Sequence, residues 1–312
     1  LTKDRSRASQ PDSTGGCSHG GGEVKARYKV LLVIVLSSQF GCAARDTDDA
    51  VALPAPPPSA RVTIAPQPPA VRLATPSAVA SRPSTTVKRT TTFGFSAEGR
   101  PLTVTEIGNP ASTYRVLIVG CIHGDESAGV AIADAITAAA PPLDADIWVV
   151  RDLNPDGIDD AQRQNARGVD LNRNFAFNWT PLGKVGAVNY SGTAAMSEPE
   201  SAAAAALILR IRPTLAIWFH QHLAVVDDSQ GPRAVEQRLG QLVGLPLSQL
   251  PDYTGSAVGW EDQVLGPTAF VVELPAGALP EAAVRRYVDA VNTVATMLSA
   301  PGTSAGPRSP SR

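Results

Sequence analysis

Short apolar runs that alternate with helical patterns constrain this chain more than any other feature of its sequence. Residues 115–120 form an apolar run suited to a buried strand, and a polar turn and an Ala-rich helical pattern over residues 126–140 follow it. The order recurs with a strand-like run at 146–150, a helical pattern at 200–211 and a further strand at 215–219. Such alternation is typical of proteins with a parallel sheet. We therefore expect an α/β fold, a three-layer α/β/α sandwich around a mixed, largely parallel, twisted sheet.

The limits of this domain follow from its outermost elements. Two β-rich runs, residues 91–95 and 102–107, flank a turn segment and predict a hairpin at the edge of the domain. A last strand at residues 269–273 precedes a closing helix over residues 280–298. A chain of 312 residues, 43% of them apolar, can bury a sizeable core. We expect one globular domain over residues 91–300.

The flanking residues have compositions that disfavour a packed core. Residues 1–23 are polar and rich in Gly and Ser, and we expect a disordered or non-native extension. Residues 24–42 place basic residues before a short apolar run, the layout of a signal peptide, and end at Cys42 in a sequence that resembles a lipoprotein cleavage site. Residues 43–90 predict a Pro/Ala-rich disordered linker, and residues 301–312 a disordered tail. We expect export to the cell envelope or the medium, either with a lipid anchor at Cys42 or by plain secretion.

The charge of the domain excludes one class of partner. Residues 93–300 contain 13 Lys and Arg residues against 23 Asp and Glu residues, although the formal net charge of the whole chain is only −2. Nucleic-acid-binding proteins take much of their affinity from a basic face that meets phosphates. An acidic domain repels phosphates, so we exclude nucleic acid as a partner.

Polar side chains that could bind a ligand or take part in catalysis follow the expected strands. His123, Asn154, His220 and Glu273 each stand at or just past the carboxyl end of a strand-like run. In open α/β sheets, binding sites form beyond these strand ends. We therefore expect four separate segments to meet at one rim of the sheet.

A metal site is the first chemistry that these residues suggest. His123 and Glu126 have the i, i+3 spacing that lets one loop offer an imidazole and a carboxylate together, and His220 completes the ligand set of a catalytic zinc ion with one open position. The alternative for the first pair is a solvated helix N-terminus, where acidic residues are favoured by the helix dipole. For His222 we favour a position that faces the substrate or that supports a metal ligand without binding the metal. We expect one zinc ion per domain, held by His123, Glu126 and His220.

The remaining candidates bear on catalysis and recognition. Glu273 ends an apolar run, where an unpaired carboxylate is costly, so we expect it to act as general acid/base at the rim. Arg163 and Arg173 lie in a polar segment and can pair with a substrate carbonyl and a terminal carboxylate. Ordinary surface ion pairing is the alternative for these arginines. The segment as a whole suits recognition of an anionic substrate.

Several motifs in this order resemble the zinc carboxypeptidase family over residues 93–300. They are His-x-x-Glu from His123, Asn-Pro-Asp-Gly from Asn154, Gly-Val-Asp-Leu-Asn-Arg-Asn-Phe from Gly168, the later histidine, and Glu-Leu-Pro-Ala-Gly from Glu273. Within that family, residues 94–100, His-Gly-Asp-Glu, Ser191-Gly192 and Ser197-Glu198-Pro199-Glu200 resemble the bacterial murein peptide amidase branch. That branch acts on cell-wall peptides.

The resemblance implies a role for each matching position. It implies carboxylate binding at Asn172 and Arg173, oxyanion stabilisation at Arg163 and catalysis at Glu273, beside the three zinc ligands. It also implies a tyrosine on a loop before the catalytic glutamate, for which Tyr253 is the candidate. Asp125 departs from the digestive carboxypeptidases, which carry an arginine there, so substrate contacts on that side must differ.

Together these features predict a zinc-dependent metallopeptidase or amidase that hydrolyses an amide bond in a peptide with a free carboxylate, derived from murein. In this hypothesis Glu273 accepts a proton from a water that zinc has made acidic, and later donates it to the leaving amine. Two alternatives remain, an N-acyl amino acid deacylase with the same ligands and a non-catalytic lipoprotein that binds wall peptides. The sequence leaves open which amide bond is cut, whether cleavage is terminal or internal, and the oligomeric state.

Overall fold

The computed structural model describes residues 86–140, 144–229 and 231–299. The expected N-terminal extension, the signal peptide with Cys42, nearly all of the linker and the C-terminal tail lie outside the described residues, so these remain predictions. Within the part of the chain that is described, no helix combines the length and the apolar character needed to cross a bilayer.

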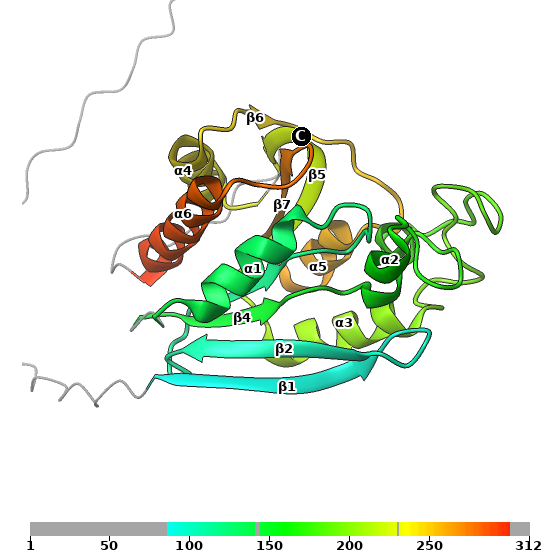
Figure 1. Ribbon diagram of the computed structural model, residues 1–312, viewed down its shortest axis with the longest axis horizontal. Coiled ribbons are helices and arrows are strands. Elements are labelled where there is room, and N and C mark those ends of the chain that lie inside the picture. The colour runs from blue at the N-terminus through cyan, green and yellow to red at the C-terminus, as the bar shows by residue number, and fades with distance from the viewer. Residues whose placement is uncertain (1–85, 141–143, 230, 300–312) are drawn as a thin grey trace, which may run out of the picture. The chain divides into compact units, whose positions relative to one another are not determined.

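One mixed sheet forms the centre of the domain (Figure 1). Its strands run in the order β1-β2-β4-β3-β5-β6, and β7 pairs with β5. The pairs β1–β2 and β2–β4 are antiparallel, whereas β3 is parallel to β4 and β5, and β5 is parallel to β6 and β7. The predicted largely parallel sheet with an edge hairpin is thereby confirmed. The strands are β1 (Val87–Phe95), β2 (Pro101–Gly108), β3 (Arg115–Val119), β4 (Asp146–Val150), β5 (Leu215–Asp227), β6 (Leu247–Ser248) and β7 (Ala269–Pro275).

Helices cover both faces of this sheet and complete the predicted three layers. One face packs against α1 (Ala128–Ala138), α4 (Arg233–Val243) and α6 (Glu281–Ser299). The other face packs against α3 (Pro199–Ile211) and α5 (Ala257–Leu265). The long connection from β4 to α3 contains a short helix, α2 (Pro155–Asp160), and the single 3-10 turn η1 (Leu171–Arg173).

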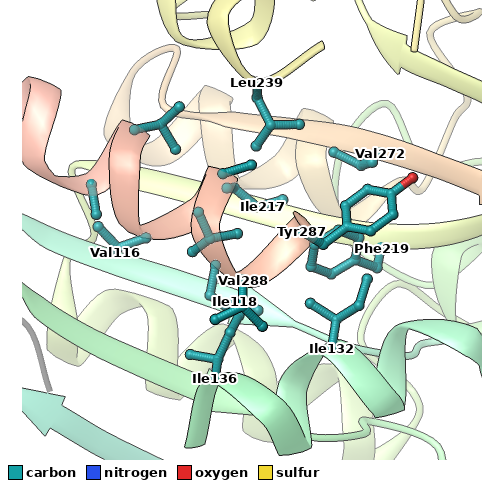
Figure 2. Close-up of a cluster of buried hydrophobic side chains, with 14 of the residues drawn as sticks. Val116, Ile118, Ile132, Ile136, Ile217, Phe219, Leu239, Val272, Tyr287 and Val288 are labelled. Atoms are coloured by element: carbon teal, nitrogen blue, oxygen red, sulfur yellow. The ribbon is translucent and has the colours of Figure 1, made fainter. Parts of the chain in front are cut away.

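The alternation of side chains along the strands explains the two cores. In β3, Val116 and Ile118 enter the core under α1 and α6, while Leu117 and Val119 enter the core under α3. Successive strand residues point to opposite faces, so a continuous apolar run is what a strand buried on both sides requires. Figure 2 shows the first core, in which side chains from the sheet meet those of three helices. Its labelled members are Val116, Ile118, Ile132, Ile136, Ile217, Phe219, Leu239, Val272, Tyr287 and Val288.

Two predicted boundaries are wrong, and one of them changes how the site is built. β1 begins at Val87, inside the stretch predicted to be linker. β5 does not end near Phe219 but continues to Asp227, because irregular register steps after His222 let it keep pairing with β7 and β6. His220 and Glu273 therefore lie within strands and not at their ends.

Candidate metal centre

The three predicted metal ligands lie together. His123 follows β3, and a tight turn closed by a 3.0 Å hydrogen bond from the Glu126 amide to the His123 carbonyl places Glu126 just before α1. His220 lies on β5, the strand that is next to β3 in the sheet. One potential ligand atom from each of the three lies within 4.8 Å of the others, and no second group of this kind occurs among the described residues. The structure thus brings the predicted ligand set into one cluster.

The His123 ring has the hydrogen bonding that a metal ligand needs, and His220 Nδ1 lies 3.1 Å from Glu126 Oε2. His123 Nε2 lies 3.1 Å from Asp170 Oδ1, while His123 Nδ1 is buried without a hydrogen-bond partner, although Glu126 Oε1 is 3.0 Å away. In the neutral tautomer that donates from Nε2, Nδ1 carries a lone pair, so Nδ1 and Glu126 Oε1 are two electron-pair donors next to each other. Two such donors are what a metal cation needs from its ligands. A histidine ligand backed by a carboxylate is the usual arrangement at zinc sites, so these residues fit a zinc ion.

The electrostatics of the cluster also favour a cation. Burial by itself would raise the pKa of Glu126, yet contacts with His123 and His220 hold its pKa well below the usual range. Burial would lower the pKa of His123, but Asp170 and Glu126 raise it instead. Burial likewise opposes ionisation of Asp170, and its contact with His123 nonetheless brings its pKa down to about 2. Two anionic carboxylates therefore flank the buried His123 ring.

Glu273 lies opposite one of these ligands. His220 and Glu273 are partners in the parallel register of β5 and β7, so their side chains leave the sheet on the same face. The backbone amide of Leu223 lies 3.4 Å from Glu273 Oε2, a long contact from the exposed part of β5. The Glu273 side chain is partly buried and lines the same pocket as the ligands. Glu273 therefore lies in the pocket, on the strand next to His220, and its role as general acid/base stays a prediction.

Arg163 lies against the ligand cluster itself. Its Nη1 donates to Glu126 Oε1 at 2.8 Å, and its Nε donates to Asp170 Oδ2 at 3.0 Å. Its backbone is held by Asn154, a fully buried side chain whose Nδ2 donates to the Arg163 and Gln164 carbonyls. Nη2 makes no hydrogen bond to the described residues, so one edge of the guanidinium remains available to a ligand. The alternative of ordinary surface ion pairing does not describe this arginine, because its side chain is only 23% exposed.

The predicted carboxylate-binding residues lie along the same pocket. Asn172 accepts a 2.9 Å hydrogen bond from the Ala257 amide at the start of α5. Arg173 places its guanidinium carbon 4.2 Å from the centroid of the Tyr253 ring, a cation–π contact. Burial lowers the pKa of Arg173, although Asp170 opposes that shift. Tyr253 is partly exposed and therefore stands where a ligand could meet it.

A pocket of about 590 Å³ joins all of these side chains. Every residue predicted for the site lines it, including His222, which is exposed on β5. The wall formed by β5, α5 and the segment between them adds three carboxylates, those of Asp227, Asp252 and Asp262. Burial raises the pKa of Asp262 to about 6. The predicted residues that line the pocket are His123, Glu126, Arg163, Asn172, Arg173, His220, His222, Tyr253 and Glu273.

Sequence reasoning assigned no role to Asp170 or Gln221, which both contact the ligand cluster. Asp170 is fully buried between His123 and Arg163 and also accepts the amide of Asn172. Its position within Gly-Val-Asp-Leu-Asn-Arg was a usable signal, since a buried aspartate in a polar motif needs cationic or donor partners. Gln221 follows His220 directly, and its backbone amide donates to Glu126 Oε2 at 3.0 Å. No local pattern marks that contact.

Comparison with known proteins identifies relatives of this chain. The sequence model of the family described as zinc carboxypeptidase matches residues 77–226. Murein peptide amidase A of Escherichia coli (strain K12) is 36% identical over 183 residues, which cover 54% of this chain and 74% of that protein. The corresponding protein of Vibrio campbellii (strain ATCC BAA-1116) is 33% identical over 201 residues, covering 59% and 79%.

Solved structures of zinc carboxypeptidase-like proteins share the fold of this chain. The crystal structure of murein-tripeptide amidase MpaA from Escherichia coli O157 matches with a TM-score of 0.56 at 29% identity, covering 69% of this chain and 93% of that one. Carboxypeptidase A from Helicoverpa armigera matches with a TM-score of 0.61 at 20% identity, covering 70% and 69%, which speaks for the fold alone. The chain therefore belongs to the zinc carboxypeptidase family of hydrolases.

Proposed function

We propose that this protein is a zinc-dependent amidase that hydrolyses an amide bond in a carboxylate-bearing peptide derived from the bacterial cell wall. The observation that carries the proposal is the cluster of His123, Glu126 and His220 with Glu273 opposite His220. The substrate class is supported by relatives that are named murein peptide amidase A. The signal-peptide layout of residues 24–42 supports action outside the cytoplasm, where such peptides occur.

In this proposal His123, Glu126 and His220 hold the zinc ion. Bound zinc supplies a Lewis acid that polarises the substrate carbonyl and makes water acidic near neutral pH. Glu273 accepts the proton of the attacking water and delivers it to the leaving amine nitrogen, because its carboxylate is in the pocket and carries only one weak hydrogen bond from the described residues. Glu273 thus acts first as base and then as acid.

The cationic side chains have separate tasks in this reaction. Arg163 presents Nη2 to the carbonyl oxygen while Nε and Nη1 keep the guanidinium fixed on Asp170 and Glu126. Arg173 and Asn172 bind the free carboxylate of the substrate, and Tyr253 covers Arg173. His222 contacts the substrate from the exposed part of β5.

The experiment is digestion of defined murein peptides by the purified protein, with mass analysis of the products. We expect one amide bond to be cut, and we expect a chelator to abolish cleavage and added zinc to restore it. The Glu273→Gln variant should retain one zinc ion per chain and lose nearly all hydrolysis. A glutamine variant with normal turnover would refute the role of Glu273.

The same assay separates the two alternative functions. N-acyl amino acids, offered beside the wall peptides, are the preferred substrates of a deacylase. A non-catalytic binding protein would retain wall peptides on the metal-loaded protein and release no product. Preferred cleavage of N-acyl amino acids, or binding of wall peptides without cleavage, would contradict the proposal.

A further inference from the structure

The side chain of Gln221 joins two parts of the site that are far apart in the sequence. Its Oε1 accepts a hydrogen bond from the amide of Ala128 at 2.9 Å. Its Nε2 donates to the carbonyls of Pro275 at 2.8 Å and of Gly277 at 2.9 Å. All hydrogen-bonding atoms of this side chain are thereby used.

On one side, Gln221 supports the segment that carries Glu126. Ala128 is the first residue of α1, and Ser127, which stands at the N-cap position, makes no capping hydrogen bond with its side chain. The first amides of a helix have no partner within the helix, so the Gln221 oxygen takes the part of a cap. The Gln221 backbone amide also donates to Glu126 Oε2 at 3.0 Å. Two hydrogen bonds from one residue therefore fix the Glu126 carboxylate and the helix that follows it.

On the other side, Gln221 supports the segment that carries Glu273. Pro275 ends β7, and the carbonyls of Pro275 and Gly277 follow Glu273 closely along the chain. Gln221 is paired with Leu274 in the register of β5 and β7. The amide side chain thus holds the end of β7 against α1 as well as against β5.

We propose that Gln221 is a positioning residue that fixes Glu273 relative to the metal ligand Glu126. The inference rests on the proposed function, in which these two carboxylates act together. Gln221 is suited to this task because its one oxygen faces a backbone donor while its one nitrogen faces two backbone acceptors. A misplacement of about 1 Å between catalytic groups is enough to cost a large factor in rate.

Two substitutions distinguish the hydrogen bond to Ala128 from the hydrogen bonds to Pro275 and Gly277. Gln221→Glu keeps an oxygen for the Ala128 amide but removes both donors to Pro275 and Gly277. Gln221→Met has a similar length and makes neither set of hydrogen bonds. Gln237→Met, at an exposed position of α4, is the matched control.

The measurements are the visible spectrum of the cobalt-substituted protein, zinc affinity, and kcat and KM on a cleaved wall peptide. For Gln221→Glu we expect an unchanged cobalt spectrum and zinc affinity, with kcat lower by about 10- to 100-fold and KM little changed. For Gln221→Met we expect an altered cobalt spectrum and zinc affinity weaker by about 10-fold or more, in addition to the loss in kcat. Gln237→Met should match the wild type.

Native kcat in Gln221→Glu, or a native cobalt spectrum in a folded Gln221→Met, would overturn the inference. A fall in thermal stability without either change would show that Gln221 only stabilises the fold. If the wild-type protein binds metal and cuts no wall peptide, the proposed function fails, while the cobalt spectra still decide whether Gln221 fixes Glu126. If Gln221→Met does not fold, Gln221→Glu carries the test.

Discussion

His220 and Glu273 occupy the same register position on the neighbouring parallel strands β5 and β7. The backbones of a predicted metal ligand and of the predicted general acid/base are therefore separated by one inter-strand spacing, which is about 4.8 Å in a sheet. Because both residues lie within strands, the sheet itself sets their relation. Sites built on strands hold their geometry more closely than sites built on loops.

Asp170→Asn should weaken zinc binding by about 10- to 100-fold, because the charge that fixes the His123 ring and its tautomer is lost. Titration of the metal-free protein with zinc against a competing chelator measures the effect. Asp289→Asn, at an exposed site of α6, is the control and should bind zinc like the wild type. Equal affinities in the two variants would mean that Asp170 does not support His123.

Arg163→Ala should lower kcat by about 100- to 1,000-fold, because a preorganised positive charge beside the developing oxyanion is lost. Steady-state kinetics on the peptide that the wild type cleaves is the measurement. Arg238→Ala, on the exposed side of α4, serves as the control. Unchanged turnover in Arg163→Ala would refute the assigned role.

Gly124→Ala should disrupt the loop between the two ligands His123 and Glu126. A Cβ atom at position 124 would come within 2.0 Å of the Gly157 carbonyl carbon and 2.2 Å of its oxygen, and these backbone atoms can move only with the chain around them. We expect a loss of about 1–3 kcal/mol in the free energy of unfolding, together with weaker zinc binding. Thermal unfolding and zinc titration test this.

Ser127→Ala is the matched control for that loop, because Ser127 is exposed and does not cap α1 with its side chain. It should leave stability and zinc affinity unchanged. A Gly124→Ala variant as stable as Ser127→Ala would show that the two loops around Gly124 and Gly157 are free to separate.

Glu261→Gln should make the protein more stable at alkaline pH. Glu261 is fully buried on α5, and burial raises its pKa to about 8, although a 3.0 Å hydrogen bond from Trp218 Nε1 opposes the shift. The folded state therefore keeps a proton that the unfolded state releases near its ordinary pKa of 4.5. The stabilising contribution is complete below that value and is lost as pH rises towards about 8. Glutamine keeps an acceptor for Trp218 and has no proton to lose.

The measurement is the midpoint of thermal unfolding of the metal-free protein from pH 5 to about pH 9. The difference in stability between Glu261→Gln and the wild type should grow as pH rises towards about 8 and level off above that value. Glu236 and Asp262 have raised pKa values of about 7 and about 6, but both are present in either protein and so largely cancel in the difference. Glu281→Gln, at an exposed position of α6, should show no such trend. A constant difference for Glu261→Gln would mean that Glu261 is ionised in the folded state.

The ligand cluster could be predicted because the fold class could be. Strand-like runs and helical patterns indicated parallel strands, and parallel strands bring successive carboxyl ends to one side of the sheet. His123 and His220 follow from that reasoning even though β5 runs on past His220. The continuation is hard to see in the sequence because Ala224, with φ of 54°, takes a backbone conformation that glycine or asparagine usually marks.

The partners of these residues could not be predicted. Asp170 contacts His123, and Gln221 contacts Ala128, only because segments far apart in the sequence come together in the fold. A sequence shows which side chains need partners, whereas the choice among many donors and acceptors depends on coordinates. Helix α5 also escaped prediction, since its nine residues carry little periodicity of their own and its start depends on Ser256 accepting the Gly259 amide.

The order of the site residues along the chain is also the order in which the ribosome adds them. The first two ligands, the third ligand and Glu273 are made in that sequence, and β7 is the last strand of the sheet. A nascent chain that stops before β7 would contain all three proposed metal ligands but would lack the carboxylate proposed for proton transfer. The proton transfer proposed for Glu273 therefore requires synthesis of the chain through β7, the last strand among the described residues.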